Sequence, residues 1–320
     1  MKAMVYREYG SPDVLALEEV DKPTPKADEV LVKVHASSIN DWDWGLLRGQ
    51  PYVNRLPGLR TPTNPILGCD VAGQVEAVGE KVTRFHSGDE VFGDLSGSGF
   101  GCYAEYVCAR ENALTLKPAS LTFEQAAAVP QAGVLATLGL RRRGEIQPGQ
   151  NVLVNGAGGG AGSFAVQIAK AFEAEVTGVD NTVKQDMMTS IGADHAIDYT
   201  KEDFTWNGQR YDYILDNAAH HSIFAYRCSL ASGGTYVMLG GSMGRILQGA
   251  VVGPIMSLIG SKKLGLLMLR ANRDLDFLME LIETGKVEPV IDKTYPLSEL
   301  AEAFRRFGKG YALGKLVITV

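Results

Sequence analysis

The stretch Asn151–Lys170, NVLVNGAGGGAGSFAVQIAK, constrains the fold of this chain more than any other. An apolar strand pattern leads directly into glycines, and the glycines lead directly into a helical pattern. Within the stretch, Ala157, Gly159 and Gly162 follow the spacing of the G-x-G-x-x-G fingerprint, with alanine in the first place. A side chain at Gly159 would hold a phosphate away from the backbone, and one at Gly162 would push the helix off the strand. The stretch therefore predicts a strand–turn–helix unit that binds a diphosphate at a helix N-terminus.

An acidic residue completes this pattern. Asp180 follows the next predicted strand, Glu175–Val179, and stands 18 residues after Gly162. Its carboxylate is expected to accept the two ribose hydroxyls of NAD and to repel the additional phosphate of NADP. Lys184 could bind that phosphate, so we expect NAD(H) as the preferred cofactor and NADP(H) as a possible one. The turn residues expected to contact the dinucleotide are Ala157, Gly158, Gly159, Gly160, Ala161 and Gly162.

Two further loops follow predicted strands and should reach the same side of the sheet. One follows Tyr211–Leu215 and the other follows Thr235–Leu239. Ligands bind at the carboxyl edge of such sheets, so both loops are candidates for contacts with the nicotinamide half of the cofactor. Ordinary turn chemistry explains the same residues equally well. The candidates are Asn217, Ala218, Gly240, Gly241 and Ser242.

The order of predicted elements divides the chain. From Leu121 onward, strands and helices alternate, which indicates a doubly wound parallel α/β sheet. Short strands and glycine turns precede Leu121, and the strand-rich tail is expected to return to that β-rich part. A chain of 320 residues exceeds what one core usually holds. We therefore predict a β-rich domain from residues 1–118 and 286–320, and a Rossmann dinucleotide-binding domain from residues 119–285.

Composition and charge exclude several classes of function. A net charge of −6 works against nucleic-acid and anionic membrane surfaces. The basic run Arg141–Arg143 is expected to be solvated. The longest apolar segment, Ile246–Gly260, is shorter than the ~18 residues of a membrane span, and we interpret it as a buried or interface helix. Four cysteines without a C-x-x-C pair, and no signal peptide, indicate reduced thiols in the cytoplasm.

These features together resemble the medium-chain dehydrogenase/reductase superfamily, specifically its zinc-independent quinone oxidoreductase branch. The resemblance covers essentially the whole chain. It implies a GroES-like β-rich catalytic domain made from both chain ends, plus the Rossmann domain. It also implies a homodimer that pairs Rossmann sheets through the apolar segment Ile246–Leu269. The stretches that carry it, besides the glycine turn, are Leu67–Gly79, Gly88–Gly93, Ala104–Tyr106, Ala126–Pro130, Ile191–Tyr199 and Gly314–Val317.

The resemblance also bears on zinc. Zinc-containing members place a cysteine in the segment that here reads SINDWDW, a His-Glu pair at Cys69–Asp70, and another cysteine near Gln131. Here the first position is Asn40, and an amide binds zinc poorly. The segment Asp94–Gly101 holds none of the cysteines of a structural zinc lobe. We therefore predict that the chain binds no metal.

Three residues are candidates for the chemistry. The resemblance places Asn40 and Asp43 at the mouth of the substrate cleft, where Asn40 could donate a hydrogen bond to the oxygen that gains charge. Asp43 could orient water or a loop, and Tyr52 could donate its hydroxyl proton. Each could instead be a capping or packing residue. Gln131 could take a polar role near the nicotinamide or simply pack.

The predicted function is a zinc-independent NAD(P)(H)-dependent oxidoreductase that transfers hydride to a quinone or an α,β-unsaturated carbonyl. Two alternatives stay open. One is a zinc-free NAD-dependent alcohol or aldehyde dehydrogenase, and the other is a catalytically weak cofactor-binding redox sensor. In each case the expected partner is a small molecule, not a nucleic acid or a membrane.

Overall fold

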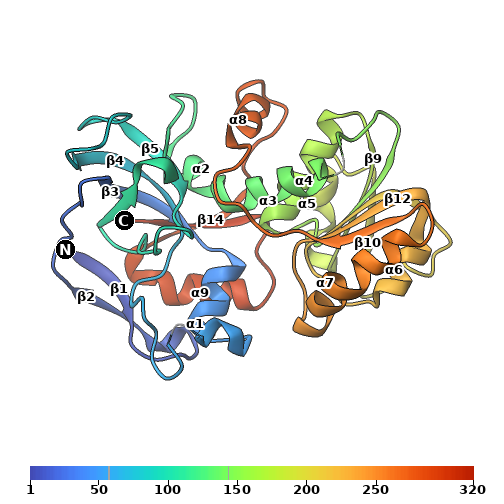
Figure 1. The fold of residues 1–320 in the computed structure, drawn as a ribbon, viewed down its shortest axis with the longest axis horizontal. Coiled ribbons are helices and arrows are strands. Elements are labelled where there is room, and N and C mark those ends of the chain that lie inside the picture. Colours follow the sequence, from blue (N-terminus) through green and yellow to red (C-terminus); the bar gives the residue numbers. More distant parts are fainter. Residues whose placement is uncertain (57, 143) are drawn as a thin grey trace. The chain divides into compact units, whose positions relative to one another are not determined.

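The computed structural model describes residues 1–56, 58–142 and 144–320. It divides into two compact units, the first made of Met1–Gln131 with Ile291–Val320 and the second of Ala132–Val290 (Figure 1). The first unit extends beyond the predicted boundary at 118 because helix α2 (Phe123–Ala128) packs on strands β3, β4 and β15. Arg143, in the predicted basic run, lies outside the described residues.

The first unit is a GroES-like β domain that both ends of the chain build. Its larger sheet has the order β14-β15-β3-β4-β5-β7, and β6 also pairs with β3. The last strand, β15, runs parallel to β14 and antiparallel to β3, so the tail returns to this unit. A second sheet pairs β1 with β2. The strands are β1 (Lys2–Tyr6), β2 (Leu15–Glu19), β3 (Glu29–Ser38), β4 (Asp70–Val78), β5 (Glu90–Asp94), β6 (Tyr106–Arg110), β7 (Thr115–Leu116), β14 (Ile291–Pro296) and β15 (Lys315–Thr319).

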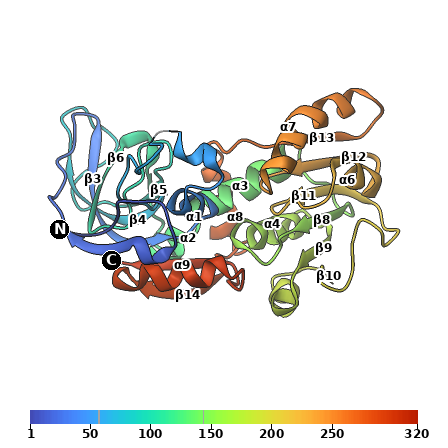
Figure 2. The same ribbon diagram turned by 90° about the horizontal axis from the view of Figure 1, so that it is seen from below.

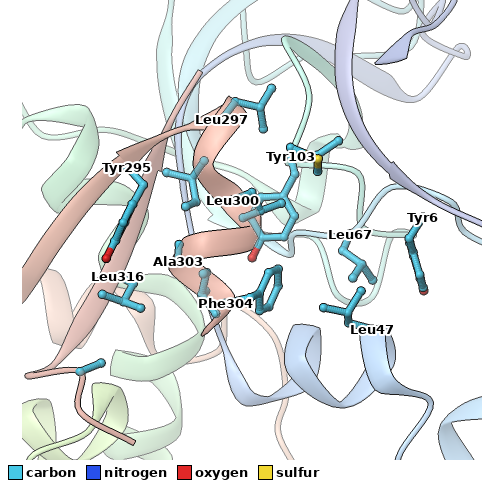
Figure 3. Close-up of a cluster of buried hydrophobic side chains, with 14 residues drawn as sticks. Tyr6, Leu47, Leu67, Tyr103, Tyr295, Leu297, Leu300, Ala303, Phe304 and Leu316 are labelled. Carbon is cyan, nitrogen blue, oxygen red and sulfur yellow. The ribbon is translucent and has the colours of Figure 1, made fainter. Parts of the chain in front are cut away.

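The two larger hydrophobic clusters among the described residues of this unit hold most of its core. The predicted alternation in β3 is confirmed, because Val30, Val32 and Val34 are all buried in one cluster. The other cluster lies around helix α9 (Leu300–Gly308), whose Phe304 meets the Tyr103 ring edge-on at 6.0 Å (Figure 3). Helix α1 (Asp41–Arg48) contributes a buried leucine to this cluster. Burial of these apolar side chains therefore stabilises the β domain.

The second unit is a doubly wound Rossmann fold. Its six parallel strands have the order β10-β9-β8-β11-β12-β13, and the order reverses between β8 and β11. Ligands of such sheets bind at this reversal point. Figure 2 shows helix α7 beside β13 and away from helix α4. The elements are α3 (Pro130–Arg141), β8 (Asn151–Asn155), α4 (Gly160–Ala171), β9 (Glu175–Asp180), α5 (Gln185–Ser190), β10 (His195–Asp198), β11 (Tyr211–Asp216), α6 (Ile223–Ser229), β12 (Leu230–Met238), α7 (Met243–Leu258), β13 (Lys263–Leu266) and α8 (Leu275–Glu283).

Helix α7 has an unusual distribution of side chains. The buried positions include Gly249 and Gly253, where an added Cβ would meet Met238 Cε at 3.0 Å and Leu264 O at 3.2 Å. Ile246, Val252 and Met256 are partly buried against the core, whereas other large apolar side chains point outward, and Leu247 is 64% exposed. Of the two predicted states, a buried helix is therefore wrong, and an interface helix stays a prediction. Within the described part of the chain, no helix has the length and hydropathy of a membrane span.

Candidate functional site

The glycine turn between β8 and α4 is the first part of the site. Gly156 has a φ of +76°, a left-handed conformation that favours glycine. A Cβ at Gly162 would lie 2.0 Å from the carbonyl oxygen of Gly156, so the helix packs directly on the turn as predicted. At Gly159 the nearest described atom would lie 3.4 Å from an added Cβ. Packing within the described residues therefore explains the glycine at 162 but not the one at 159.

Helix α4 presents unbonded amides at this turn. It begins at Gly160 with Gly159 as its N-cap, and no acidic residue stands in its first turn. The first N–H groups of a helix have no carbonyl within the helix to bond, and the helix dipole adds partial positive charge there. Gly160, Ala161 and Gly162 thus form a cradle without side-chain bulk, and this arrangement fits a diphosphate.

Asp180 and Lys184 form a buried pair beside the turn. Asp180 Oδ2 accepts a hydrogen bond from the Gly158 amide at 3.0 Å and lies 3.4 Å from Lys184 Nζ. Its Oδ1 accepts from the Asn181 amide at 2.8 Å. The stem of Lys184 covers Gly158, where a Cβ would lie 2.5 Å from Lys184 Cδ. The predicted contact of Asp180 with a ribose stays a prediction, and Lys184 already compensates the charge of this carboxylate.

The loops that follow β11 and β12 meet, as their strand positions imply. The Ala219 amide donates to Gly240 O at 3.1 Å, and Ala219 also bridges to Gly241. Asn217 donates its side-chain amide to Asn155 O at 2.9 Å. Its Oδ1 is buried and has no hydrogen-bond partner among the described residues. An orphaned acceptor of this kind fits a ligand that brings its own donor.

The carboxylate of Asp216, at the end of β11, is hydrogen-bonded to these loops. Its carboxylate is fully buried and accepts from Asn155 Nδ2 at 2.7 Å, Tyr236 OH at 2.9 Å and the Ala218 amide at 3.1 Å. Burial raises the pKa of Asp216, and hydrogen bonds from Tyr226, Asn155 and Tyr236 oppose that rise. Ser242, the last predicted contact, is the N-cap of α7 and is exposed. The carboxylate therefore fixes the two loops that carry the predicted nicotinamide contacts.

A buried polar cluster lies in the first unit. It brings together residues from the end of β3, the start of α1, the start of β4 and the start of β15. The end of β3 and the start of β4 lie side by side because Ser38 and Asp70 stand opposite each other in the β3–β4 register. We use the term polar cluster for Asn40, Asp43, Cys69, Asp70, Asp94, Gln131 and Lys315, all of which are buried.

Asp70 is the most heavily bonded member of the polar cluster. Its Oδ2 accepts from Ser38 Oγ at 2.7 Å and from Asn40 Nδ2 at 2.9 Å, and lies 3.5 Å from Lys315 Nζ. Its Oδ1 accepts from the backbone amide of Gln131 at 3.0 Å. The hydrogen bonds of a buried carboxylate compensate for the water it has lost.

Asn40 and Asp43 lie together, as predicted. Asn40 Nδ2 donates both to Asp70 and to Cys69 Sγ, the latter at 3.3 Å, so its two amide protons are both engaged within the protein. Asp43 caps helix α1 by accepting from the Asn40 amide at 3.1 Å, and it also accepts from the Gly68 amide at 3.1 Å. Burial and nearby Asp70 raise the pKa of Asp43 to about 7. The geometry favours the capping alternative for Asp43, and a catalytic role for either residue stays a prediction.

Tyr52 is not part of the polar cluster. It lies in a short 3-10 turn, Tyr52–Arg55, and is 76% exposed. The guanidinium of Arg55 stands over its ring at 5.2 Å. A proton-donor role for Tyr52 therefore stays a prediction that no contact within the first unit supports.

Comparison with known proteins adds the family. Residues 26–119 match the family model "Alcohol dehydrogenase GroES-like domain", and residues 191–318 match "Zinc-binding dehydrogenase". A 2-methylene-furan-3-one reductase from Solanum lycopersicum is 37% identical over 99% of this chain and 79% of its own length. An NADPH-dependent alkenal/one oxidoreductase, chloroplastic, from Arabidopsis thaliana is 36% identical with the same two shares. The structure of the quinone oxidoreductase from Coxiella burnetii superposes with a TM-score of 0.88 at 29% identity, covering 100% of this chain and 99% of that one.

The chain belongs to the medium-chain dehydrogenase/reductase superfamily, in its quinone oxidoreductase-like branch. The predicted superfamily, fold class and enzyme class, an NAD(P)-dependent oxidoreductase, are thereby confirmed. The nicotinamide cofactor follows from the same relationship, whereas its exact form does not.

Two positions that the resemblance aligns with the zinc site, Cys69 and Asp70, converge with Asp94 in this structure. Cys69 Sγ and carboxylate oxygens of Asp70 and Asp94 all lie within 4.8 Å of one another. However, Asn40 Nδ2 and Gln131 Nε2 point N–H donors at the sulfur, the latter at 3.1 Å. Burial raises the pKa of Cys69 well above its ordinary value. N–H donors around the sulfur do not suit a zinc site, and the absence of zinc stays a prediction.

Sequence reasoning missed Lys315. In the sequence this residue belongs to the Gly314–Val317 stretch that carries the family resemblance, and no pattern predicts a role for it. The signal was present, because a lone lysine opens the otherwise apolar strand KLVITV. Gln131, for which two roles were open, donates to Cys69 and to Asp94 inside the first unit.

Proposed function

We propose that this member of the superfamily reduces a quinone or an α,β-unsaturated carbonyl with NAD(P)H and without zinc. The glycine turn carries the proposal, because packing leaves open space beside Gly159, and the close approach of a diphosphate fits that space. The substrate class is supported by two relatives whose names contain an enone and an alkenal/one.

The second unit would hold the cofactor. The amides of Gly160, Ala161 and Gly162 would take the diphosphate, and Asn217 Oδ1 would accept a donor from the nicotinamide half. We propose NAD(H) as the preferred form because of Asp180, and NADP(H) as an accepted form because Lys184 compensates that carboxylate. When bound, the nicotinamide supplies a hydride.

The first unit would stabilise the oxygen that becomes negative during reduction. A donor at that oxygen lowers the barrier. Asn40 would have to release one of its two present bonds to serve, whereas the exposed Tyr52 hydroxyl could serve as it stands. Asp43 would act on substrate only indirectly, through its cap on α1.

We further propose that the chain forms a homodimer and acts in the cytoplasm. Strand β13 ends its sheet, and α7 beside it presents an apolar outer face, which suits a second copy of this chain. Four cysteines without disulfides support a reducing compartment.

The decisive experiment is a cofactor titration followed by an acceptor panel. Fluorescence titration with NADH and NADPH should give saturable binding of at least one of them. Enones and quinones should then be turned over. Turnover of alcohols with the oxidised cofactor, but not of enones, would favour the alcohol dehydrogenase alternative. Tight binding without any turnover would favour the redox sensor, and absence of binding would refute all three.

A further inference from the structure

Lys315 is a buried lysine to which the proposed reaction assigns no role. Its side chain is 2% exposed. The ammonium donates to the backbone oxygen of Ile39 at 3.1 Å, to Asn40 Oδ1, and lies 3.5 Å from Asp70 Oδ2. Desolvating an ammonium costs several kcal/mol unless it is paired and hydrogen-bonded. Three acceptors therefore account for its position, but they do not explain why a cation is needed there.

The charges around it supply a reason. Three buried carboxyl groups, Asp43, Asp70 and Asp94, share this region with Lys315. The remaining ionisable groups that face them are Cys69, Cys102, Tyr103 and Tyr6, and burial raises the pKa of each of these. Those four are neutral near pH 7, so they add no positive charge. Among the described residues of the first unit, Lys315 is thus the buried cation that opposes these carboxylates.

The bonds of Asn40 show what the ammonium orders. Because Lys315 donates to Oδ1, the Nδ2 group must point the other way, toward Cys69 and Asp70. Without the ammonium, the two ends of this amide could exchange, and one orientation would aim Oδ1 at the Asp70 carboxylate. The orientation of Asn40 therefore depends on a residue 275 positions away.

We infer that Lys315 is a positioning residue, which fixes the Asn40 amide and supplies, inside the polar cluster, the positive charge that zinc supplies in zinc-containing members of the superfamily. Its effect on turnover rests on the proposed function, but its effect on the cluster does not. The carboxylate that faces Lys315 belongs to Asp70. The family resemblance places Asp70 where zinc-containing members have the acidic residue of their His-Glu pair.

The sign of the pH effect follows from Asp43. Its pKa is about 7 in the folded chain and 3.8 as the reference value, so the folded state holds an extra proton between these values. Stability from this group is complete at low pH and is lost as the pH rises from about 4 through about 7. Lys315 opposes the rise in this pKa. Removal of its charge raises the pKa further and extends the loss of stability to higher pH.

The test compares thermal unfolding of the wild type, Lys315→Met and Lys315→Arg from pH 5 to 8.5. The Tm deficit of Lys315→Met should be larger at pH 8.5 than at pH 5 by about 5 °C or more. Lys315→Arg keeps the charge, so its deficit should not vary with pH. The matched control is Lys293→Met, which removes an exposed lysine from β14 and should show no pH-dependent deficit. A deficit of Lys315→Met that is equal at both pH values would overturn the inference, because a packing role alone predicts it.

A double variant covers the case in which Lys315→Met does not fold. Asp70→Asn/Lys315→Met removes both charges of the pair and should recover folding, since the carboxylate that lies 3.5 Å from the ammonium is then neutral. Failure of the double variant to fold would also overturn the inference.

A kinetic comparison separates this inference from the proposed function. NADH binding by Lys315→Met should stay within about twofold of the wild type, and kcat on an enone should fall at least about tenfold and recover in Lys315→Arg. Unchanged kcat in a folded Lys315→Met would contradict the positioning role. Absence of cofactor binding and turnover in the wild type itself would instead refute the proposed function, and the thermal experiment would still report on Lys315.

Discussion

A single carbon atom at residue 162 is enough to test the cofactor cradle. In Gly162→Ala the new Cβ would lie 2.0 Å from Gly156 O and 2.7 Å from Ala157 Cα, and both neighbours are backbone atoms that cannot rotate away. Helix α4 must move off the turn, so we expect a loss of about 1–3 kcal/mol in the free energy of unfolding. We also expect at least about tenfold weaker cofactor binding, measured by fluorescence titration.

The matched control for this substitution lies in α7. An added Cβ at Gly244 meets nothing within 4 Å, so Gly244→Ala should leave both stability and binding unchanged or slightly improve stability. Unaltered cofactor affinity in Gly162→Ala would mean that the turn does not hold the diphosphate.

The Asp180–Lys184 pair gives a second test at the residue scale. Lys184→Met leaves the buried Asp180 carboxylate uncompensated, so NADPH affinity should fall more than NADH affinity. Asp180→Asn removes the repulsion and should shift the ratio of the two affinities toward NADPH by about tenfold, or about 1.4 kcal/mol. Asp186→Asn, which removes an exposed carboxylate nearby, is the control. If neither substitution changed the ratio, the pair would have no part in cofactor selection.

The sequence predicts the positions of these residues better than it predicts their hydrogen bonds. Gly162 was predicted with its reason, because a local pattern imposes the close approach of turn and helix. The position of Asp180 was also predictable from spacing, but its bonds to Gly158 and Lys184 were not, since they depend on side-chain orientation. The hydrogen bonds of Asn40 are not predictable from local sequence, because its partners Cys69, Asp70 and Lys315 come from distant parts of the chain.

Elements followed local sequence where the signal was local. The predicted cap Thr122 is confirmed, because its hydroxyl accepts from the Gln125 amide at 3.2 Å. The predicted strands Asn151–Asn155 and Asp70–Val78 have their observed bounds. Strand β12 begins at Leu230 and not at Thr235, because Leu230 already pairs with Tyr211 of β11, and the register then shifts before Thr235 pairs with Tyr213. Pairing across the sheet overrides local propensity there.

Helix α7 supports a prediction about assembly. Its outer face carries Leu247, Val251, Ile255 and Leu258, which are 54–86% exposed. Burial of such a stripe against a second copy would remove apolar surface from water, which stabilises association. We expect Leu247→Glu/Val251→Glu to convert a dimer to a monomer in light scattering without loss of cofactor binding.

The control for assembly is an exposed leucine in the other unit. Leu17, in β2, is 45% exposed, and Leu17→Glu should leave the mass unchanged. A wild-type mass of a single chain would exclude the homodimer, and a dimer that survives the double substitution would place the interface elsewhere.

At the scale of the whole molecule, the first unit combines segments from both ends of the chain, so most of its contacts join residues that are far apart in sequence. Strand β15 pairs with β3 although almost the whole chain separates them, and this pairing brings Lys315 to Asn40. The strand pattern of the tail predicts its return to the first unit, but residue patterns alone do not give the register. The predicted unit boundaries differ from the observed ones because α2 packs on the β domain, a tertiary contact that no local signal carries.

The metal content of the whole protein is the remaining prediction. Zinc requires three or four converging ligands, and here amide N–H groups of Asn40 and Gln131 and the ammonium of Lys315 occupy the space around Cys69 and Asp70. We therefore expect purified protein to contain far less than one zinc per chain by elemental analysis. Treatment with EDTA should change neither Tm nor turnover of an enone. Cys228 is exposed and could bind trace zinc. Cys228→Ser should therefore remove this trace zinc, whereas Cys69→Ser should leave it unchanged. Stoichiometric zinc that persists in Cys228→Ser, and whose removal lowers activity, would mean that the polar cluster rearranges to bind a metal.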